Sequence, residues 1–149
     1  MFTLSQRSLD RLVGVNPSLV AVVRRAIQLT AVDFAVTEGV RTLARQKQLV
    51  AEGKSQTMNS KHIAGNAVDL VVMVGGVPSW EISDYVKVAD AMKTAAKELK
   101  VSIRWGAAWS VDNLTVFAGG AKSAYDAYVA GKRQAGSKPF IDAPHFELV

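Results

Sequence analysis

The sequence contains no cysteine, and this absence removes two classes of structure. Without thiols there is no disulfide framework, and a zinc site built from cysteine thiolates is excluded. Any metal in this chain must be held by histidine and carboxylate side chains, and only two histidines, His62 and His145, are available. The same absence leaves the redox compartment of the protein unspecified.

Long apolar runs are also missing, since no stretch approaches the roughly 18 residues of a membrane-spanning helix. The N-terminus, MFTLSQRSLDRL, lacks the charged start and continuous apolar stretch of a secretory signal peptide. There is no low-complexity segment and no internal repeat. We therefore expect a single domain over residues 1–149, made as a soluble protein in the cytoplasm and without stable membrane insertion.

Basic residues outnumber acidic ones, 18 to 13, which gives a formal net charge of +5. A positive chain favours polyanionic partners such as nucleic acid, anionic membranes or the acidic polymers of a bacterial envelope. The cations are scattered, however, and no nucleic-acid-binding motif accompanies the pairs Arg24-Arg25 and Lys132-Arg133. We therefore expect a basic, solvated surface and no nucleic-acid partner.

The hydrophobic pattern predicts several helices. Asn16 before Pro17 is typical of a helix start, while Thr42 and Gly53 are typical of a cap and a stop. The expected helices lie at about residues 4–13, from Pro17 to beyond Ile27, at 42–53, at 81–99 and at 121–134.

Alternation of apolar side chains predicts the strands. The clearest strand covers residues 67–74, where Val68, Leu70 and Val72 share one face and Asp69 lies on the other. Shorter strands are expected at residues 34–36, 102–105 and 145–149. Helices with a few antiparallel strands, and no regular βαβ alternation, predict an α+β domain in which a small antiparallel sheet packs against several helices.

The carboxylate of Asp69 interrupts the apolar strand AVDLVVMV and needs a partner. A carboxylate buried alone is costly or becomes neutral, unless it is paired or bound to a metal. His62 lies seven residues earlier, so the two side chains converge only if the chain turns between them. Gly65 and Asn66 tolerate such a turn, and we expect a strand that ends near His62 and a second strand that returns from Ala67.

The second histidine completes one candidate metal set, His62, Asp69 and His145. A catalytic zinc site takes three such ligands and leaves its fourth position to water. Asp142, which precedes His145 across an Ala-Pro bend, is a candidate general base. Glu147 shares a strand face with His145 and is placed to orient it. The alternative for each histidine is a packed or solvated side chain without metal.

The spacing of these residues resembles that of a family of zinc peptidases. The pattern S-x-H-x-x-G-x-A-x-D covers residues 60–69, and D-x-x-H-F-E covers residues 142–147. Both patterns are similar to those of bacteriophage L-alanyl-D-glutamate endopeptidases, D-alanyl-D-alanine carboxypeptidases and dipeptidases, with the hedgehog signalling domain as a relative. The resemblance implies a hedgehog-like fold and one zinc ion per chain, held by His62, Asp69 and His145. It also makes Asp142 the catalytic carboxylate, and aspartate at this position points to the endopeptidases.

The resemblance extends to VTEGVRTLARQKQLVAEGKS, where a G-x-R turn precedes a helix rich in glutamine. Arg41 matches the family arginine that faces the substrate, which implies that its charge stabilises the oxyanion of the reaction. A surface salt bridge is the alternative for Arg41. Ser60, at the start of the first pattern, is expected to support the metal ligands together with Glu147.

The chain departs from the family pattern at two places. It reads WGAAW at residues 105–109, where many relatives have WGGDW, so the acidic residue is missing. Some thirty residues then separate Trp109 from Asp142, so the segment 110–138 is interpreted as an insertion near the mouth of the site. We expect its aromatic and basic residues to contact the wall polymer: Tyr125, Tyr128, Lys132 and Arg133.

The sequence as a whole predicts a phage endolysin that hydrolyses the L-alanyl-D-glutamate bond of the peptidoglycan stem peptide. The expected partner is bacterial peptidoglycan, which the enzyme reaches after release from the cytoplasm of the infected cell, and the expected state is a monomer. Two alternatives stay open. One is a D-alanyl-D-alanine carboxypeptidase or dipeptidase, and the other is a zinc-stabilised binding module without hydrolytic activity.

Overall fold

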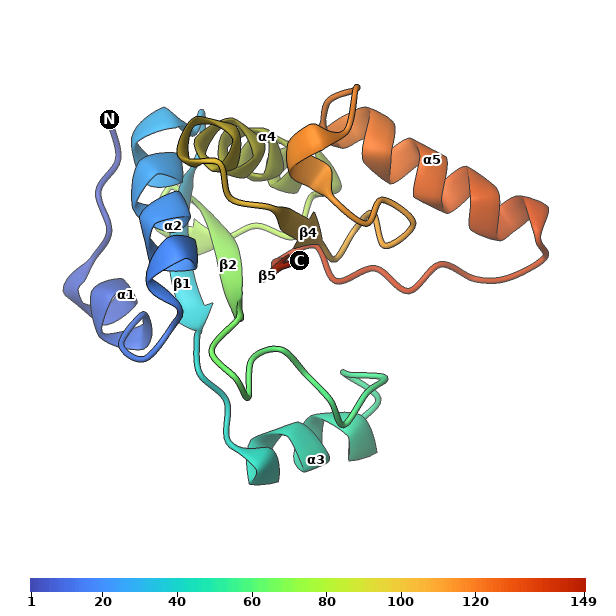
Figure 1. Ribbon diagram of the computed structural model, residues 1–149, viewed down its shortest axis with the longest axis horizontal. Helices are drawn as coiled ribbons and strands as arrows, with labels where there is room; N and C mark the ends of the chain where they lie inside the picture. The colour runs from blue at the N-terminus through green and yellow to red at the C-terminus, as the bar shows by residue number, and fades with distance from the viewer.

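The computed structural model describes residues 1–149 and contains one antiparallel sheet with helices packed beside it (Figure 1). The strands follow the order β1-β2-β5-β4, and β3 forms a hairpin with β2. Their bounds are β1 Asp33–Glu38, β2 Ala67–Val74, β3 Val77–Pro78, β4 Ile103–Trp105 and β5 His145–Leu148. The predicted α+β class is confirmed, and each strand that the alternation predicted is present.

The helices begin and end close to the predicted residues. Their bounds are α1 Gln6–Arg11, α2 Pro17–Leu29, α3 Leu43–Ala51, α4 Ile82–Leu99 and α5 Ala121–Gln134, with a short 3-10 helix at Leu114–Val116. The side chain of Asn16 accepts a hydrogen bond from the N–H of Ser18 at 2.9 Å, and Thr42 caps α3 in the same way. None of the helices combines the length and apolar character that crossing a membrane requires.

The two faces of the sheet differ in chemistry. Val68, Leu70 and Val72 of β2 are fully buried in the apolar core, on the face beside α2 and α4 (Figure 1). Asp69 points to the opposite face, because successive side chains of a strand alternate. Helix packing therefore stabilises one face of the sheet and leaves the other face for polar side chains.

Strand pairing brings polar residues of three strands together on that second face. Asp69 of β2 pairs directly with His145 of β5, and Glu147 of β5 pairs with Arg104 of β4. Residues directly opposite in an antiparallel pair hold their Cβ atoms about 4.5–5.5 Å apart. The register of β5 thus places a histidine beside Asp69, although the two residues are far apart in the sequence.

A bulge near the end of β1 adds Glu38 to the same face. Val36 pairs with Leu70, whereas Glu38 pairs with Asp69, so the register shifts by one residue between Val36 and Glu38. In a regular strand these two residues would share the core face, because side chains alternate. The extra residue of the bulge turns Glu38 toward Asp69 instead.

The connection predicted before β2 is wrong in one respect. Residues 61–65 form turns, and no strand ends near His62. Gly65 has the positive φ, +75°, expected of a turn glycine, and a Cβ atom there would lie 2.7 Å from the carbonyl oxygen of Gly14. Glycine is required for both reasons. A turn packed against the N-terminal segment, rather than a paired strand, therefore carries His62 to the site.

The segment 110–138 is part of the core. Ala121, Ala124 and Tyr128 of α5 are buried in the main apolar cluster, and α5 packs on α4 (Figure 1). The side chain of Asp90 in α4 accepts a hydrogen bond from the N–H of Ala121 at 2.8 Å and so caps α5. Whatever the origin of this segment, the fold depends on it.

Candidate metal centre and active site

Three side chains from separate parts of the chain converge on one point. The Nε2 atom of His62 lies 3.1 Å from Nδ1 of His145 and 3.2 Å from Oδ1 of Asp69. The third separation, from His145 Nδ1 to Asp69 Oδ1, is 3.5 Å. Tetrahedral zinc, with bonds of about 2.0–2.2 Å, places its ligand atoms about 3.3–3.6 Å apart. The three residues predicted as ligands therefore form a group that could hold a metal ion.

Hydrogen bonds on the outer side of each imidazole determine which nitrogen faces this point. Nδ1 of His62 lies 2.9 Å from the carbonyl oxygen of Gly39, and Nε2 of His145 lies 2.8 Å from a carboxylate oxygen of Glu147. Both partners only accept hydrogen bonds, so these nitrogens carry the protons. The lone pairs of the two inner nitrogens then face each other and the carboxylate of Asp69. A cation between them would stabilise this arrangement.

The electrostatics of the group also fit a metal. The Oδ1 atom of Asp69 is buried and has no aligned hydrogen-bond donor. Burial opposes its ionisation, but the imidazoles of His145 and His62 hold the pKa of Asp69 far below its usual range. Burial also lowers the pKa of His145, yet its contacts with Asp69 and Glu147 raise that pKa to about 9. A proton and a metal ion therefore compete for one nitrogen, and the donor set suits zinc.

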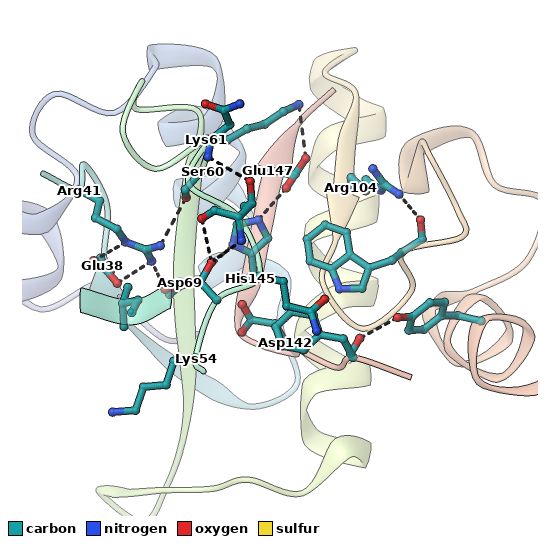
Figure 2. Close-up of a pocket in the computed structure, with 18 of the residues that line it drawn as sticks. Glu38, Arg41, Lys54, Ser60, Lys61, Asp69, Arg104, Asp142, His145 and Glu147 are labelled. Atoms are coloured by element: carbon teal, nitrogen blue, oxygen red, sulfur yellow. Dashed lines mark hydrogen bonds and ion pairs between the residues drawn. The ribbon is translucent and has the colours of Figure 1, made fainter. Parts of the chain in front are cut away.

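Asp142 lies in the wall of the same cavity as His145 and Asp69 (Figure 2). Burial, together with the negative charge of Asp69, raises the pKa of Asp142 to about 6. The N–H of His145 donates to the carbonyl oxygen of Asp142 at 3.0 Å, so one tight turn fixes the two residues relative to each other. A carboxylate whose pKa lies near the working pH is suited to proton transfer. The catalytic role of Asp142 stays a prediction.

The pair Trp105-Gly106 holds this turn in place. The indole N–H of Trp105 donates a hydrogen bond to the carbonyl oxygen of Ala143 at 2.8 Å. The backbone N–H of Gly106 donates to the carbonyl oxygen of His145, also at 2.8 Å. A Cβ atom at Gly106 would lie 2.2 Å from the carbonyl oxygen of Asp142 and 3.0 Å from Cβ of His145. Only glycine permits this approach.

Apolar packing surrounds the residues that follow this glycine. Ala107 and Ala108 are buried in the core. Trp109 packs against His145 with ring centroids 5.4 Å apart. Arg104 lies over the Trp109 ring, 5.2 Å from its centroid, and donates to the Trp109 carbonyl oxygen. The indole therefore packs against one side of the His145 ring.

Arg41 is buried, and each of its N–H groups has an acceptor. Nε and Nη2 donate to the two oxygens of Glu38 at 2.7 and 2.8 Å, and Nη2 also donates to Oδ2 of Asp69 at 3.3 Å. Nη1 donates to Gln46 at 2.6 Å and to Ser60 at 3.4 Å. Instead of a surface salt bridge, Arg41 forms a buried network. Its oxyanion role stays a prediction, and direct contact with a substrate would require release of one acceptor.

Ser60 and Glu147 each contact one of the histidines. The hydroxyl of Ser60 accepts a hydrogen bond from the backbone N–H of His62 at 3.2 Å. Glu147 accepts from His145 and lies 3.4 Å from the ammonium of Lys61. Burial opposes ionisation, but the hydrogen bond with His145 holds the pKa of Glu147 below its usual value. Both residues therefore lie where a supporting role requires them, and that role stays a prediction.

Two of the three candidate ligands, Asp69 and His145, line a cavity of about 760 Å³ with two polar walls. Residues 54–61, which follow α3, form one wall, and Trp109 with Tyr128 and Lys132 of α5 forms part of the other. Tyr125 and Arg133, also expected to contact the wall polymer, do not line the cavity. The segment 110–138 therefore contributes one aromatic and one basic side chain of the four proposed.

Cationic and acidic side chains alternate around the cavity. Figure 2 shows Arg41 and Lys54 on one side of Asp69 and His145, and Arg104 on the other. Five cationic side chains and four carboxylates line the cavity, before any metal ion is counted. Of the cations, Lys132 has no ion-pair partner within the chain. Such a cleft suits a polar ligand that carries acidic groups.

Sequence reasoning missed several residues on which the site depends. Glu38 was not identified, because the bulge that turns it toward Asp69 leaves no mark in the alternation pattern. Gln46 was part of a helix noted only as rich in glutamine, although it lies three residues before the buried Leu49 and so shares its inward face. The turn glycine whose carbonyl orients His62, Gly39, was also missed. A Cβ atom there would lie 2.1 Å from a backbone oxygen.

Comparisons with known proteins agree with this geometry. The model of the family described as phage L-alanyl-D-glutamate peptidase matches residues 1–149. The L-alanyl-D-glutamate peptidase of Escherichia phage T5 is 35% identical over 113 residues, which cover 73% of this chain and 82% of that protein. The L-alanyl-D-glutamate peptidase of Listeria phage A118 is 36% identical over 86 residues, which cover 55% of this chain and 29% of that protein.

A solved structure supports the same assignment. The crystal structure of the Serratia marcescens L-Ala D-Glu endopeptidase ChiX superposes with a TM-score of 0.72 at 36% sequence identity. The match covers 97% of this chain and 87% of that one. Family model, phage relative and solved structure all name an L-alanyl-D-glutamate peptidase. The chain therefore belongs to the phage L-alanyl-D-glutamate peptidase family.

Proposed function

We propose that this protein is a bacteriophage endolysin, a zinc metallopeptidase that hydrolyses the L-alanyl-D-glutamate bond of peptidoglycan stem peptides. The observation that carries the proposal is the inner geometry of the site, where two imidazole lone pairs and an undonated carboxylate oxygen face one point. That point lies in a polar cavity with Asp142 in its wall. Membership of the family indicates the substrate class, and the geometry of the site supports metal-assisted hydrolysis.

Each residue has a defined task in the proposed reaction. His62, Asp69 and His145 would hold a zinc ion, whose Lewis acidity would serve to activate water and polarise the scissile carbonyl. Asp142 accepts the proton of the attacking water and delivers it to the leaving amine nitrogen. Arg41 adds positive charge beside the developing oxyanion. No side chain forms a covalent bond with the substrate.

The setting of the enzyme follows from the same proposal. Peptidoglycan stem peptides carry carboxylates, and the cations around the cavity complement them. We propose that a monomer acts with one zinc ion and one catalytic domain over residues 1–149, in which 110–138 is an insertion relative to other members. Synthesis in the cytoplasm of the infected cell would precede its release to the wall.

Product analysis by mass spectrometry tests the cleaved bond. Stem peptides incubated with the enzyme should yield a fragment with a new N-terminal glutamate. Release of D-alanine instead would identify a carboxypeptidase. The peptidase names of the relatives and the presence of Asp142 favour the endopeptidase.

A turbidity assay separates an enzyme from a binding module. A suspension of outer-membrane-permeabilised bacteria should clear with the parent protein and stay turbid with Asp142→Asn at equal zinc content. A parent protein that sediments with peptidoglycan but does not clear the suspension would be a zinc-stabilised binding module.

A further inference from the structure

One wall of the cavity is attached to the rest of the chain by very few hydrogen bonds. We call residues 54–60 the lip segment, because six of them line the cavity. Within it, residues 56–59 take part in no backbone–backbone hydrogen bond. Apart from two long contacts between Thr57 and the hydroxyl of the neighbouring Ser55, one hydrogen bond joins those four residues to the rest of the protein, from the side-chain amide of Gln46 to the carbonyl oxygen of Thr57. The same amide also donates to Ser55 at 2.9 Å.

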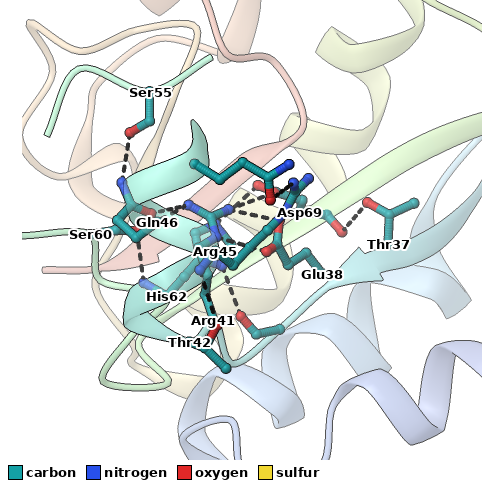
Figure 3. Close-up of polar contacts among 12 residues, drawn as sticks. Thr37, Glu38, Arg41, Thr42, Arg45, Gln46, Ser55, Ser60, His62 and Asp69 are labelled. Atoms are coloured by element: carbon teal, nitrogen blue, oxygen red, sulfur yellow. Dashed lines mark hydrogen bonds and ion pairs between the residues drawn. The ribbon is translucent and has the colours of Figure 1, made fainter. Parts of the chain in front are cut away.

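Gln46 is a buried polar residue whose side-chain oxygen and NH₂ group both have hydrogen-bond partners. Its side chain is fully buried on the inward face of α3. A guanidinium only donates hydrogen bonds, so the amide oxygen must face Arg41, at 2.6 Å, and the NH₂ group must face the lip segment (Figure 3). The orientation of this amide is therefore determined by its partners. Any other orientation would leave buried groups unsatisfied.

The partner of Gln46 leads directly to the metal group. Arg41 donates to Oδ2 of Asp69, and the other oxygen of Asp69 faces the two histidines. Glu38 binds the guanidinium with both oxygens and fixes its plane. The contacts run without interruption from the lip segment through Gln46 and Arg41 to a metal ligand (Figure 3).

We propose that Gln46 is a positioning residue that couples the substrate-facing lip segment to the metal ligand Asp69 through Arg41. Its NH₂ group holds the lip segment against the cavity, and its oxygen holds the guanidinium that orients Asp69. Substrate contact with the lip segment and coordination at Asp69 are therefore linked through one amide. The part of this inference that concerns substrate contact with the lip segment rests on the proposed function, whereas the part that concerns the orientation of Asp69 does not.

Two substitutions separate the effect of Gln46 on the lip segment from its effect on Asp69. Gln46→Glu keeps an oxygen for Arg41 but places an acceptor against the carbonyl oxygen of Thr57, so it should release only the lip segment. Gln46→Met has similar length and makes neither hydrogen bond, so it should release the lip segment and weaken the orientation of Asp69. Gln48→Glu and Gln48→Met are the matched controls, because Gln48 is exposed on the same helix and contacts only Arg45 and Glu52.

Hydrogen exchange and metal competition provide readouts without substrate. Exchange of the hydrogen-bonded amides of the lip segment, those of Lys54, Ser55, Thr57 and Asn59, should accelerate about fivefold or more in both Gln46 variants of the zinc-loaded protein. Zinc affinity, measured by chelator competition, should fall about tenfold in Gln46→Met and stay within about threefold in Gln46→Glu. The visible spectrum of the cobalt-loaded protein should change in Gln46→Met alone. Both Gln48 controls should match the parent in all three measurements.

Kinetics on stem peptides complete the test. Gln46→Glu should raise KM with little change in kcat, and Gln46→Met should also lower kcat. The proposal is overturned if lip exchange in Gln46→Glu equals the parent's, or if Gln46→Met binds zinc as tightly as the parent. If Gln46→Met does not fold, Arg41→Lys replaces it, because lysine lacks the second nitrogen that reaches Gln46. Unchanged zinc affinity in Arg41→Lys would also overturn the proposal. If the parent protein has no peptidase activity, the proposed function is refuted, but the exchange and zinc measurements still test the role proposed for Gln46.

Discussion

Two carboxylates flank His145, and their surroundings shift their pKa values in opposite directions. Glu147 accepts hydrogen bonds on the outer side of the imidazole, where it fixes the tautomer that exposes Nδ1 to the metal position. Asp142 lies in the cavity wall, where burial raises its pKa to about 6. A buried carboxylate with a raised pKa, such as Asp142, is suited to accept and release a proton. A carboxylate that is hydrogen-bonded to an imidazole, such as Glu147, is suited to stay ionised.

We predict that Asp142→Asn leaves zinc bound and lowers kcat by at least about 10²-fold, because the amide keeps the shape and removes the basicity. Glu147→Gln should be milder, with zinc affinity about 10-fold lower because His145 loses its orienting carboxylate. Steady-state kinetics and metal analysis on the same preparations check both. The reverse pattern, with Asp142→Asn nearly normal and Glu147→Gln inactive but zinc-loaded, would transfer the role of base to Glu147.

A glycine exchange tests the turn that carries both Asp142 and His145. Gly106→Ala should destabilise the protein by about 1–3 kcal/mol and reduce zinc affinity, since the new Cβ atom overlaps that turn. Gly131→Ala is the control, because Gly131 lies in α5 with no atom within 4 Å of its Cβ position. It should stabilise the helix by about 0.5–1 kcal/mol. Denaturant unfolding measures both, and equal stability of the two variants would contradict the argument.

At the scale of elements, β-strands carry two of the three candidate metal ligands, a turn carries the third, and loops or helices form the walls. Asp69 and His145 are fixed by the sheet register, whereas the lip segment and α5 approach from either side of it. Tyr128 of α5 donates to the carbonyl oxygen of Phe140 at 2.8 Å and so anchors the segment that leads to Asp142. Removal of 110–138 would therefore remove core residues as well as a wall, and single substitutions are the sharper test.

Lys132 provides such a test for α5. Lys132→Ser should raise KM for stem peptides by about two- to fivefold, because one exposed charge contact contributes about 0.2–1 kcal/mol. Arg133→Ser is the matched control, since Arg133 carries the same charge, is exposed and lies outside the cavity. The effect of Lys132→Ser should decline as salt rises. Equal KM values for the two variants would show that α5 contributes only to packing.

At the scale of the whole molecule, the metal group joins parts of the chain that are distant in sequence. His62 comes from a turn, Asp69 from β2 and His145 from the last strand, 83 residues after His62. Three ligands from three segments connect the N-terminal and C-terminal halves of the fold. Because the unfolded chain cannot hold these ligands together, metal binding should stabilise the folded state selectively.

Chelation measures this stabilisation. At a free zinc concentration of about 1,000 times Kd, binding contributes about 4 kcal/mol, so removal of the metal should lower Tm by about 10 °C. Metal analysis should show one zinc per chain before chelation. His145→Ala should lose most of the zinc and show no further Tm change with chelator. A His145→Ala protein that kept full zinc occupancy would refute the ligand assignment.

The sequence by itself determined most of the elements, the candidate metal set and the resemblance to the family, because these depend on local patterns. Capping residues marked the starts of α2 and α3, alternation marked β2, and two histidines with one carboxylate in an apolar strand left a single candidate metal set. Only the tertiary structure decided which residues hold those ligands in place. The bulge that turns Glu38 toward Asp69, the turn that replaces a strand at His62 and the path from Gln46 to Asp69 depend on register and on contacts between distant segments. Local spacing carries no information about such contacts, since the residues involved meet only after the sheet has paired and the helices have packed.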